Sequence, residues 1–369
     1  MKGDIATGGL SRRRLGALTA AAGLMSAAAT GAAPGRAAAA PKAGAEVGFV
    51  LSHEQFRTNE LADLAVRAER AGFDRVWASD HSQPWQDNQR HSMHPWLTLA
   101  LVGERTSTLT FGTGVTCPLY RHHPAEVAQA FASLGVLSPG RVFLGVGAGE
   151  ALNERAATGR FGRYQERHDR LAEAVGLIRT LWTGRRTTFH GTYYQTDQFR
   201  LYDLPPRAVP IMVAASGPRS ARLAGQHGDG WITGAADFAK PELRDAFAAG
   251  ARAAGKDPDA MPKFVETMVA VGGEPDVEYA AERWRFTVDA FGDLLYQPNP
   301  VTIQRLAEQR WPLPQVYAKW PRGTDPAPHI AVLQHIIDGG GTPFVHSGQS
   351  DQRRVIDFYG AEVLPKLHP

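Results

Sequence analysis

An acid, an imidazole and an indole stand within six residues of one another at Asp80, His81 and Trp85. They follow the short apolar run 76–79, which is typical of a buried strand, and Pro84 cannot continue a sheet ladder. A carboxylate and an imidazole can hold and move a proton, and a Trp can form the floor of a pocket. A capping Asp, a hydrogen-bonded His and a packing Trp fit the same spacing, so both interpretations stay open on these residues alone.

Further polar side chains follow other apolar runs of the same kind. They are Glu54, Cys117, Glu150, Asn153 and Ser216. In a barrel of parallel strands, the carboxyl ends of all strands meet at one face, where active sites are built. We therefore expect these groups to contribute to a single site.

The elements that must position these groups alternate between short apolar runs and longer amphipathic stretches. Strands are predicted at 46–51, 75–79, 109–115, 141–146, 210–214, 230–233, 264–271 and 342–346. Helices are predicted at 60–71, 95–103, 124–137, 164–182, 241–254, 276–290 and 353–367, with another after Ser216 and a hairpin at 187–196. Residues 291–324 are Pro-rich and predicted to be irregular, apart from a short helix at 302–309. The pattern predicts one (β/α)8 TIM barrel over residues 41–369, with insertions at its C-terminal face.

Two glycine-containing segments follow predicted strands. The run 145–150 superficially resembles a dinucleotide-binding loop, but it lacks the third glycine at the required spacing, which disfavours a Rossmann fold. Glycines after a barrel strand instead allow the backbone to approach a flat ring or a phosphate. The run 216–220 leads into a helix and offers amide groups and the cation of Arg219 to a phosphate.

The first forty residues have the organisation of an export signal. A twin arginine lies within 12–14, the apolar run 17–33 follows, and small residues come next at 37–40. These three regions in order predict a twin-arginine signal peptide at 1–40 and an exported protein of the cell envelope or periplasm, with the Tat machinery as a partner. A disordered Ala-rich tail on a cytoplasmic protein is the alternative.

Charge and cysteine content exclude several classes of function. The formal net charge is +3, but residues 1–40 contain five basic and one acidic side chain, so the remainder carries −1 and gives no basis for nucleic-acid binding. The chain has one cysteine, Cys117, so an intrachain disulfide and a multi-thiolate zinc site are impossible. Neither a metal centre nor a serine nucleophile elbow is indicated, although His53, His81, His122 and His123 leave a metal as an alternative.

Four segments together resemble a known family. They are 79–85 (SDHSQPW), 112–115 (GTGV), 141–154 (RVFLGVGAGEALNE) and 228–232 (GDGWI). The chain is similar to the luciferase-like superfamily, and within it to the group of coenzyme F420-dependent glucose-6-phosphate dehydrogenases, from about residue 47 to 367. Segments 51–58 and 77–88 are also similar to an exported member of that group that acts on hydroxymycolic acid.

The resemblance implies a role for each matching residue. His81 and Glu150 would be the catalytic pair, with His81 as base at the substrate hydroxyl and Glu150 as proton carrier near the reduced cofactor ring. The reverse assignment of these two roles, or assistance by Glu54, stays open. Trp85 and Glu54 would line the pocket. The residues implied in binding coenzyme F420 are Asp80, Gly114, Val115, Cys117, Ala148, Gly149, Asn153, Ser216, Gly217, Arg219 and Ser220. Gly114 and Val115 would be joined by a non-prolyl cis peptide bond behind the cofactor ring. For Cys117, a buried small apolar role is favoured even if it touches the cofactor.

One departure from the glucose-6-phosphate enzymes concerns the substrate. The run 234–237 lacks their phosphate-binding Lys and ends in Asp237, the run 291–300 contains no Lys or Arg, and only Lys319 remains as a candidate. An unpaired phosphate is costly to bury, so a sugar phosphate is disfavoured. The resemblance then implies an F420-dependent alcohol dehydrogenase that oxidises a lipid-type secondary alcohol, hydroxymycolic acid, to the ketone. No nucleic-acid partner is expected.

The alternatives are a flavin-dependent monooxygenase of the same superfamily, an F420-dependent sugar-phosphate dehydrogenase, and an exported protein that binds a lipid or cofactor without turnover. The resemblance also implies a homodimer.

Overall fold

Eight parallel strands close into a barrel in the computed structural model, which describes residues 44–369. The strands are β1 (Gly48–Leu51), β2 (Arg75–Ala78), β3 (Thr110–Thr113), β4 (Val142–Val146), β7 (Ile211–Ala214), β8 (Gly230–Gly234), β9 (Lys263–Val269) and β10 (Thr342–Ser347). Their order around the barrel is β1-β10-β9-β8-β7-β4-β3-β2. The predicted (β/α)8 barrel and all eight predicted strands are confirmed. The predicted signal peptide lies outside the described residues.

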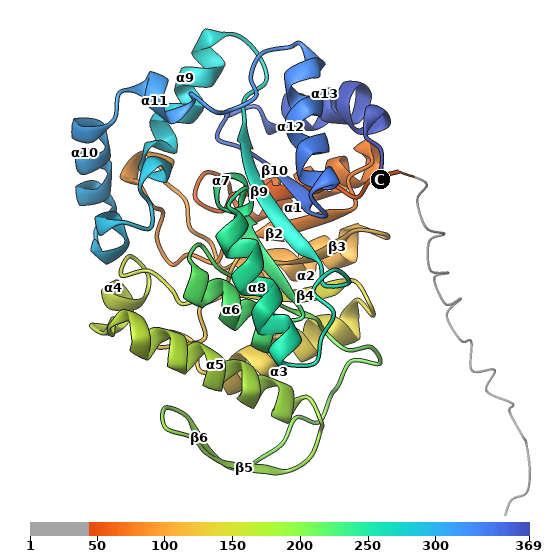
Figure 1. Ribbon diagram of the computed structural model, residues 1–369, viewed down its shortest axis with the longest axis vertical. Helices are drawn as coiled ribbons and strands as arrows, with labels where there is room; N and C mark the ends of the chain where they lie inside the picture. The colour runs from red at the N-terminus through yellow and green to blue at the C-terminus, as the bar shows by residue number, and fades with distance from the viewer. Residues whose placement is uncertain (1–43) are drawn as a thin grey trace, which may run out of the picture. The chain divides into compact units, whose positions relative to one another are not determined.

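The helices cover the outside of the barrel (Figure 1). They include α1 (Thr58–Ala71), α2 (Pro95–Arg105), α3 (Pro124–Leu137), α5 (Tyr164–Leu181), α6 (Pro218–His227), α8 (Pro241–Ala253), α12 (Pro326–Asp338) and α13 (Gln352–Phe358). Six helices, α2, α3, α6, α8, α10 (Pro300–Arg310) and α12, begin with proline, whose fixed φ suits the first helical turn and whose missing N–H is not needed there. No helix within residues 44–369 combines the length and the apolar character needed to cross a membrane.

The inside of the barrel is filled by large apolar side chains. Val50, Trp77, Phe143, Met212, Ile232, Phe264 and Phe344 form this inner cluster. The rings of Trp77 and Phe344 stack with centroids 3.9 Å apart. Strands β3 and β4 approach closely because Gly145 has no side chain: a Cβ there would lie 1.9 Å from the Thr113 carbonyl oxygen. The lower barrel is therefore a packed core, which leaves the carboxyl ends of the strands as the place for a site.

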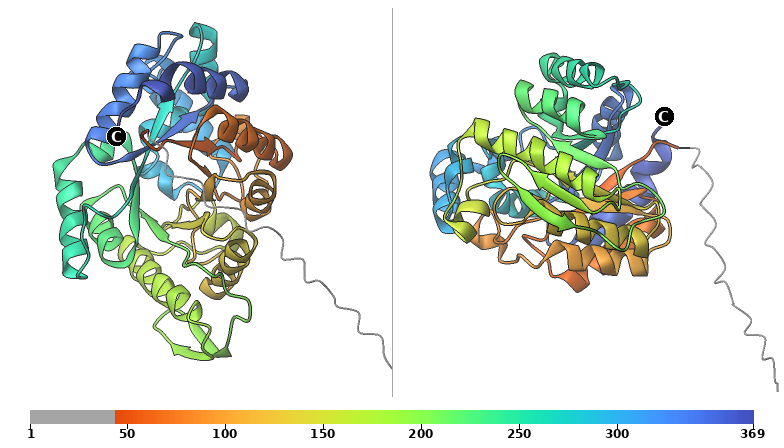
Figure 2. Two further views of the ribbon diagram at one scale, coloured as in Figure 1. Left: turned by 90° about the vertical axis from the view of Figure 1, so that its right-hand side faces the viewer. Right: turned by 90° about the horizontal axis from the view of Figure 1, so that it is seen from below.

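The hairpin predicted at 187–196 is present as the antiparallel pair β5 (Thr187–His190) and β6 (Gln195–Phe199). Figures 1 and 2 show it alongside α5. The carboxylate of Glu173 on α5 accepts hydrogen bonds from the backbone N–H groups of Thr192, Tyr193 and Tyr194, at 2.8–2.9 Å. The carboxylate of one α5 residue thus orders the backbone of the hairpin turn, and the Tyr194 hydroxyl joins the turn to the loop after β3 by donating to the Pro118 carbonyl at 2.9 Å.

The last third of the chain differs most from expectation. The helix predicted at 276–290 is α9 (Glu274–Arg283) and is followed by a separate 3-10 turn, η2 (Arg285–Val288). Residues 291–324 hold η3 (Asp293–Tyr296), α10 and α11 (Leu313–Val316), so the predicted short helix is confirmed but the segment is more ordered than expected. Helix α12 was not predicted, and the predicted final helix changes after α13 into a π turn, η4 (Tyr359–Val363), and a 3-10 turn, η5 (Leu364–Lys366).

The segment between β9 and α12 forms its own apolar cluster, which also includes two residues from the loops after β2 and β4. Its members include Trp85, Leu152, Val277, Trp284, Phe286, Leu294, Ile303 and Trp320. Figure 1 draws α9, α10 and α11 together at one side of the barrel. The predicted insertion therefore packs against the residues that flank the polar groups at the barrel mouth.

Candidate active site

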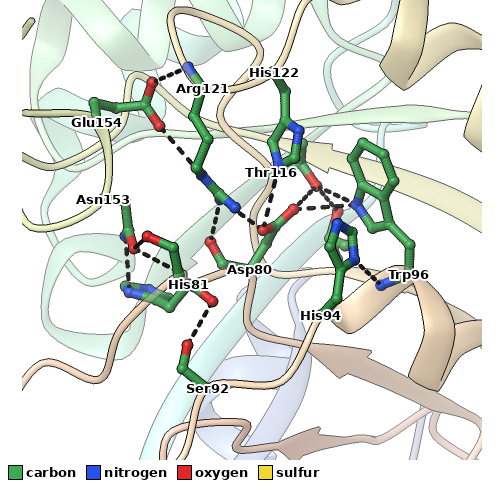
Figure 3. Close-up of polar contacts among 12 residues, drawn as sticks. Asp80, His81, Ser92, His94, Trp96, Thr116, Arg121, His122, Asn153 and Glu154 are labelled. Carbon is green, nitrogen blue, oxygen red and sulfur yellow. Dashed lines mark hydrogen bonds and ion pairs between the residues drawn. The ribbon is translucent and has the colours of Figure 1, made fainter. Parts of the chain in front are cut away.

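Asp80, directly after β2, has a side chain that several neighbours hold in place at the barrel mouth (Figure 3). Its Oδ2 accepts hydrogen bonds from the Thr116 hydroxyl at 2.6 Å and the Trp96 indole N–H at 3.1 Å. Its Oδ1 accepts one from the Arg121 guanidinium at 2.7 Å, and His122 Nε2 lies 3.9 Å from the same oxygen. The Asp80 side chain is completely buried, so three neighbours from the loop after β3 and one from the first turn of α2 fix its orientation.

The charge of Asp80 follows from these partners. Burial by itself would raise the pKa of Asp80, but His122, the positive charge of Arg121 and the Thr116 hydroxyl together lower it well below its ordinary value. The carboxylate is therefore ionised at any physiological pH. It provides a fixed negative charge and not a proton donor or acceptor for catalysis.

Arg121 is shared between two buried carboxylates. Glu154 Oε2 accepts the backbone N–H groups of Tyr120 and Arg121, at 3.1 and 2.9 Å, and its Oε1 lies 3.8 Å from Arg121 Nε. Burial raises the pKa of Glu154 despite these contacts. The loop after β3 is thus connected to the loops after β2 and β4 through one cation.

His81 points to a second group of polar side chains. Its Nδ1 lies 2.9 Å from the amide nitrogen of Asn153, which also donates to Glu150 Oε2 at 3.3 Å. Its Nε2 lies 3.9 Å from Oε1 of Glu54, whose Oε2 accepts the Ser79 hydroxyl at 2.7 Å. The structure therefore brings His81, Glu54, Glu150 and Asn153 together, as the sequence predicted.

Trp85 forms the boundary between this polar group and the insertion. Its ring stacks on Phe286 with centroids 4.6 Å apart and lies 5.6 Å from the His81 ring. Trp85 is buried, so it packs against the insertion and faces His81 at the same time. Both of the roles considered for it, packing residue and pocket wall, fit this position.

Residues after β3 and β4 present backbone and small side chains. Gly114 and Val115 are joined by a cis peptide bond, as the resemblance implied. Cys117 is buried, and burial raises the pKa of its thiol well above the ordinary value, so it is a neutral packing group. Its Sγ lies where a side chain on Gly149 would have to go. Ala148 and Gly149 remain partly exposed and leave their backbone accessible.

The last predicted group lies after β7, the barrel neighbour of β4. Gly217 is the N-cap of α6, and Ser220 closes the first turn by accepting the Gly217 N–H at 3.1 Å. Ser216 and Arg219 are exposed, and the Arg219 guanidinium donates to the Gln165 side chain. An exposed cation at a helix N-terminus suits an anionic group.

Several residues of the mouth carried no signal in the sequence. Arg121, Thr116, Trp96 and Glu154 were not singled out. His122 was considered only as a possible metal ligand, and the structure places it buried beside Asp80. A further series of hydrogen bonds joins the Ser52 hydroxyl to His346 Nε2 at 2.7 Å and His346 Nδ1 to Glu266. Ser52 follows β1, and Glu266 and His346 lie in β9 and β10, three strands that the sequence predicted only as apolar runs. Within residues 44–369, no cluster of three or more His, Cys, Asp or Glu side chains has metal-binding geometry.

Comparisons with known proteins place the chain among sequence relatives. A family model described as luciferase-like monooxygenase matches residues 31–313. The F420-dependent hydroxymycolic acid dehydrogenase of Mycobacterium tuberculosis is 59% identical over 321 residues, covering 87% of this chain and 88% of the relative. The F420-dependent glucose-6-phosphate dehydrogenase of Nakamurella multipartita is 41% identical over 337 residues, covering 87% and 96%.

Among solved structures, an F420-dependent secondary alcohol dehydrogenase in complex with an F420-acetone adduct superposes with a TM-score of 0.82 at 32% identity. The alignment covers 87% of this chain and 98% of that one. The coenzyme F420-dependent tetrahydromethanopterin reductase from Methanopyrus kandleri gives a TM-score of 0.70 at 20% identity, which is a likeness of fold.

Proposed function

The chain belongs to the luciferase-like monooxygenase family, and from that premise we propose that it is a coenzyme F420-dependent dehydrogenase that oxidises a secondary alcohol to a ketone. The observation that carries this proposal is the group of three proton-carrying side chains, Glu54, His81 and Glu150, at the barrel mouth. They occur in a chain that is 59% identical to a dehydrogenase of this kind.

The residues at the mouth fit a deazaflavin cofactor. Arg219 and the N-terminus of α6 suit its anionic end, and the accessible backbone of Ala148 and Gly149 can lie against a flat ring. We propose that Asp80, Gly114, Val115, Ser216, Gly217, Arg219 and Ser220 hold the cofactor, with Cys117 packed beneath it. When bound, the deazaflavin supplies the hydride acceptor, and the protein supplies the proton-handling groups.

Alcohol oxidation requires a group that takes the hydroxyl proton. Glu54 and His81 face each other across 3.9 Å and can share one substrate oxygen. Glu150 is partly exposed and hydrogen-bonded to Asn153, which places it to carry a proton at the cofactor side. Trp85 closes the pocket beside His81.

The proposed substrate is a lipid-type alcohol, hydroxymycolic acid, and the product is ketomycolic acid. The relative with 59% identity is named for this substrate, and the apolar insertion that adjoins Trp85 supplies a compatible wall. Binding of a sugar phosphate has less support, because Asp237 pairs with Lys240 at 2.8 Å and Lys319 is exposed. We further propose export through the twin-arginine pathway to the cell envelope, and a homodimer.

The first test is cofactor titration of the mature protein. Quenching of Trp fluorescence is measured with F420 and, separately, with FMN. Tight F420 binding and weak FMN binding, followed by reduction of F420 with a hydroxymycolate, would support the proposal. Tight FMN binding with oxygen consumption and no response to F420 would replace it with a monooxygenase. Turnover of glucose-6-phosphate in preference to lipid alcohols would instead indicate the sugar-phosphate dehydrogenase.

A further inference from the structure

Asn153 uses every hydrogen-bonding position of its amide group. The oxygen accepts the Ser82 backbone N–H at 2.8 Å and the Ser82 hydroxyl at 3.2 Å. The nitrogen bonds to His81 Nδ1 at 2.9 Å and to Glu150 Oε2 at 3.3 Å. Two acceptor and two donor positions are all that an amide has, and Asn153 is only 1% exposed. Its side chain therefore has nothing left for a cofactor and must act on its protein neighbours.

Only one orientation of this amide is compatible with those neighbours. The Ser82 backbone N–H can only donate, so it must face the amide oxygen. On the other side, the carboxylate of Glu150 requires a donor. If the amide were flipped, two N–H groups would oppose each other at Ser82 and two oxygens would oppose each other at Glu150. The nitrogen of Asn153 therefore faces His81.

This orientation selects the tautomer of His81. Because Asn153 donates to Nδ1, that nitrogen must present its lone pair, and the hydrogen of the neutral ring then lies on Nε2. A hydrogen on Nδ1 would point at the N–H of Asn153. His81 thus turns an N–H group, and not a lone pair, toward the pocket and Glu54.

We infer that Glu54 is the base that takes the alcohol proton, that His81 is a hydrogen-bond donor to the same substrate oxygen, and that Asn153 is the positioning residue that fixes this division. The inference deepens the proposed function and rests on it. The 3.9 Å between His81 Nε2 and Glu54 Oε1 is too long for a direct hydrogen bond, but an oxygen atom can lie about 2.8 Å from both.

The proton and electrons balance in this arrangement. The substrate O–H bond breaks and its proton passes to Glu54 Oε1. The carbinol C–H bond breaks with its electron pair, which the oxidised deazaflavin, when bound, would accept as hydride, so that carbon and oxygen form the C=O bond of the ketone. The N–H of His81 stabilises the negative charge that develops on the oxygen between these events. Glu54 is held for this role by the Ser79 hydroxyl on its other oxygen.

The first arm of the test reads the tautomer without cofactor or substrate. Protein labelled with 15N-histidine is examined by NMR, and the signals of His81 are assigned by their loss in His81→Gln. We expect hydrogen on Nε2 and a lone pair on Nδ1. Asn153→Asp has nearly the same shape but accepts at both oxygens, so it should move the hydrogen to Nδ1. A hydrogen on Nδ1 in the wild type would overturn the inference.

The second arm compares two conservative variants in F420 reduction by the alcohol. Glu54→Gln removes the base and should lower kcat by about 10²-fold or more. His81→Gln keeps an N–H donor, so its kcat should fall much less than that of Glu54→Gln. The kcat of His81→Leu, which has no donor, should fall further than that of His81→Gln. A larger fall in kcat for His81→Gln than for Glu54→Gln would overturn the assignment.

The two arms separate failure of this inference from failure of the proposed function. If no alcohol reduces F420 with the wild-type protein, the proposed function and the assignment of Glu54 both fall, whereas the tautomer measurement still decides the positioning role of Asn153. Circular dichroism of each variant shows whether a lower kcat is accompanied by a loss of folded structure. The tautomer is read in the wild type, and a folded variant is needed only to assign the His81 signals. If His81→Gln does not fold, the loss of the same signals in His81→Leu provides the assignment.

Discussion

The two sides of the barrel mouth are held together by different interactions. On the side of β2, β3 and β4, buried ionic groups form a connected set: Asp80, Arg121 and Glu154 with Thr116 and Trp96. On the side that follows β9, the insertion forms an apolar cluster around residues such as Leu294 and Ile303, both fully buried. The stability of the first side depends on hydrogen-bond and ion-pair partners in fixed positions. The stability of the second side depends on how well the apolar side chains fill the space between them.

The difference predicts unequal tolerance of small chemical changes. A hydrogen-bonded charge loses its compensation when one partner is altered, since the remaining partner stays buried. An apolar cluster tolerates the replacement of one apolar side chain by another of similar volume with a small loss of stability. Four measurements test this difference in tolerance.

The largest effect is expected for Asp80→Asn. The change keeps the shape but leaves Arg121 without its closest counter-charge, so we expect the free energy of unfolding to fall by about 3–5 kcal/mol. Urea denaturation followed by Trp fluorescence measures it. The matched control is Asp63→Asn, because the Asp63–Arg105 pair has a similar N–O distance, 2.8 Å, but exposed side chains; its loss should be at most about 1 kcal/mol. Similar losses of unfolding free energy in the two variants would show that the buried Asp80–Arg121 pair contributes no more to stability than an exposed ion pair.

The next effect is an acid sensitivity at His53. Burial lowers the pKa of His53 from 6.5 to about 4, and its ring nitrogens have no hydrogen-bond partner. The unfolded chain therefore binds a proton before the folded protein does. The stability that this residue contributes is present above pH 6.5 and is lost as the pH falls to 4, by about 3 kcal/mol in total.

His53→Leu has no titrating group and is the comparison. Unfolding free energies at pH 7 and pH 4 should differ less in this variant than in the wild type. An equal difference in the two proteins would show that His53 does not carry the sensitivity.

A smaller effect is expected for Thr116→Val. The replacement has the same shape but removes the 2.6 Å hydrogen bond to Asp80, and the loss should be about 1–3 kcal/mol. Denaturation midpoints of Thr116→Val and Thr116→Ser show whether the hydroxyl or the methyl group matters. Rescue by Ser is the expected result, and a Ser variant as weak as the Val variant would contradict it.

The smallest effect is expected for Ile303→Val on the apolar side. Ile303 is fully buried, and removal of one methylene group should cost about 0.5–1.5 kcal/mol. A loss greater than that of Thr116→Val, measured in the same denaturation series, would reverse the comparison between the two sides.

The sequence predicted the polar side in part. Asp80 and His81 were recognisable because charged residues directly follow an apolar run, and Glu54, Glu150 and Asn153 were recognisable for the same reason. Arg121 and Thr116 were not, because their roles arise from contacts to a residue 41 and 36 positions away. Such contacts depend on which loops the barrel brings together, which local residue patterns do not encode.

The apolar side was harder to predict. The helix expected at 276–290 ends at Arg283, where Trp284 turns inward and donates its indole N–H to Gln55 at 2.6 Å. Residues 326–338 were not recognised as α12, since Pro326 and Pro328 obscure the start of its helical period. In both places, tertiary contacts or prolines override the local apolar spacing.

Closure of the barrel has a consequence for how the protein is made. Strand β1 pairs with β10, joining Gly48 to Phe344 and Phe49 to Val345. The ionic set of the mouth comes from residues 80–154, which leave the ribosome long before β10 is synthesised. Until then, β1 and β9 each have an edge without its partner, and such edges invite pairing with other chains. A chain interrupted before residue 342 is therefore a target for proteolysis or aggregation, and not a smaller enzyme.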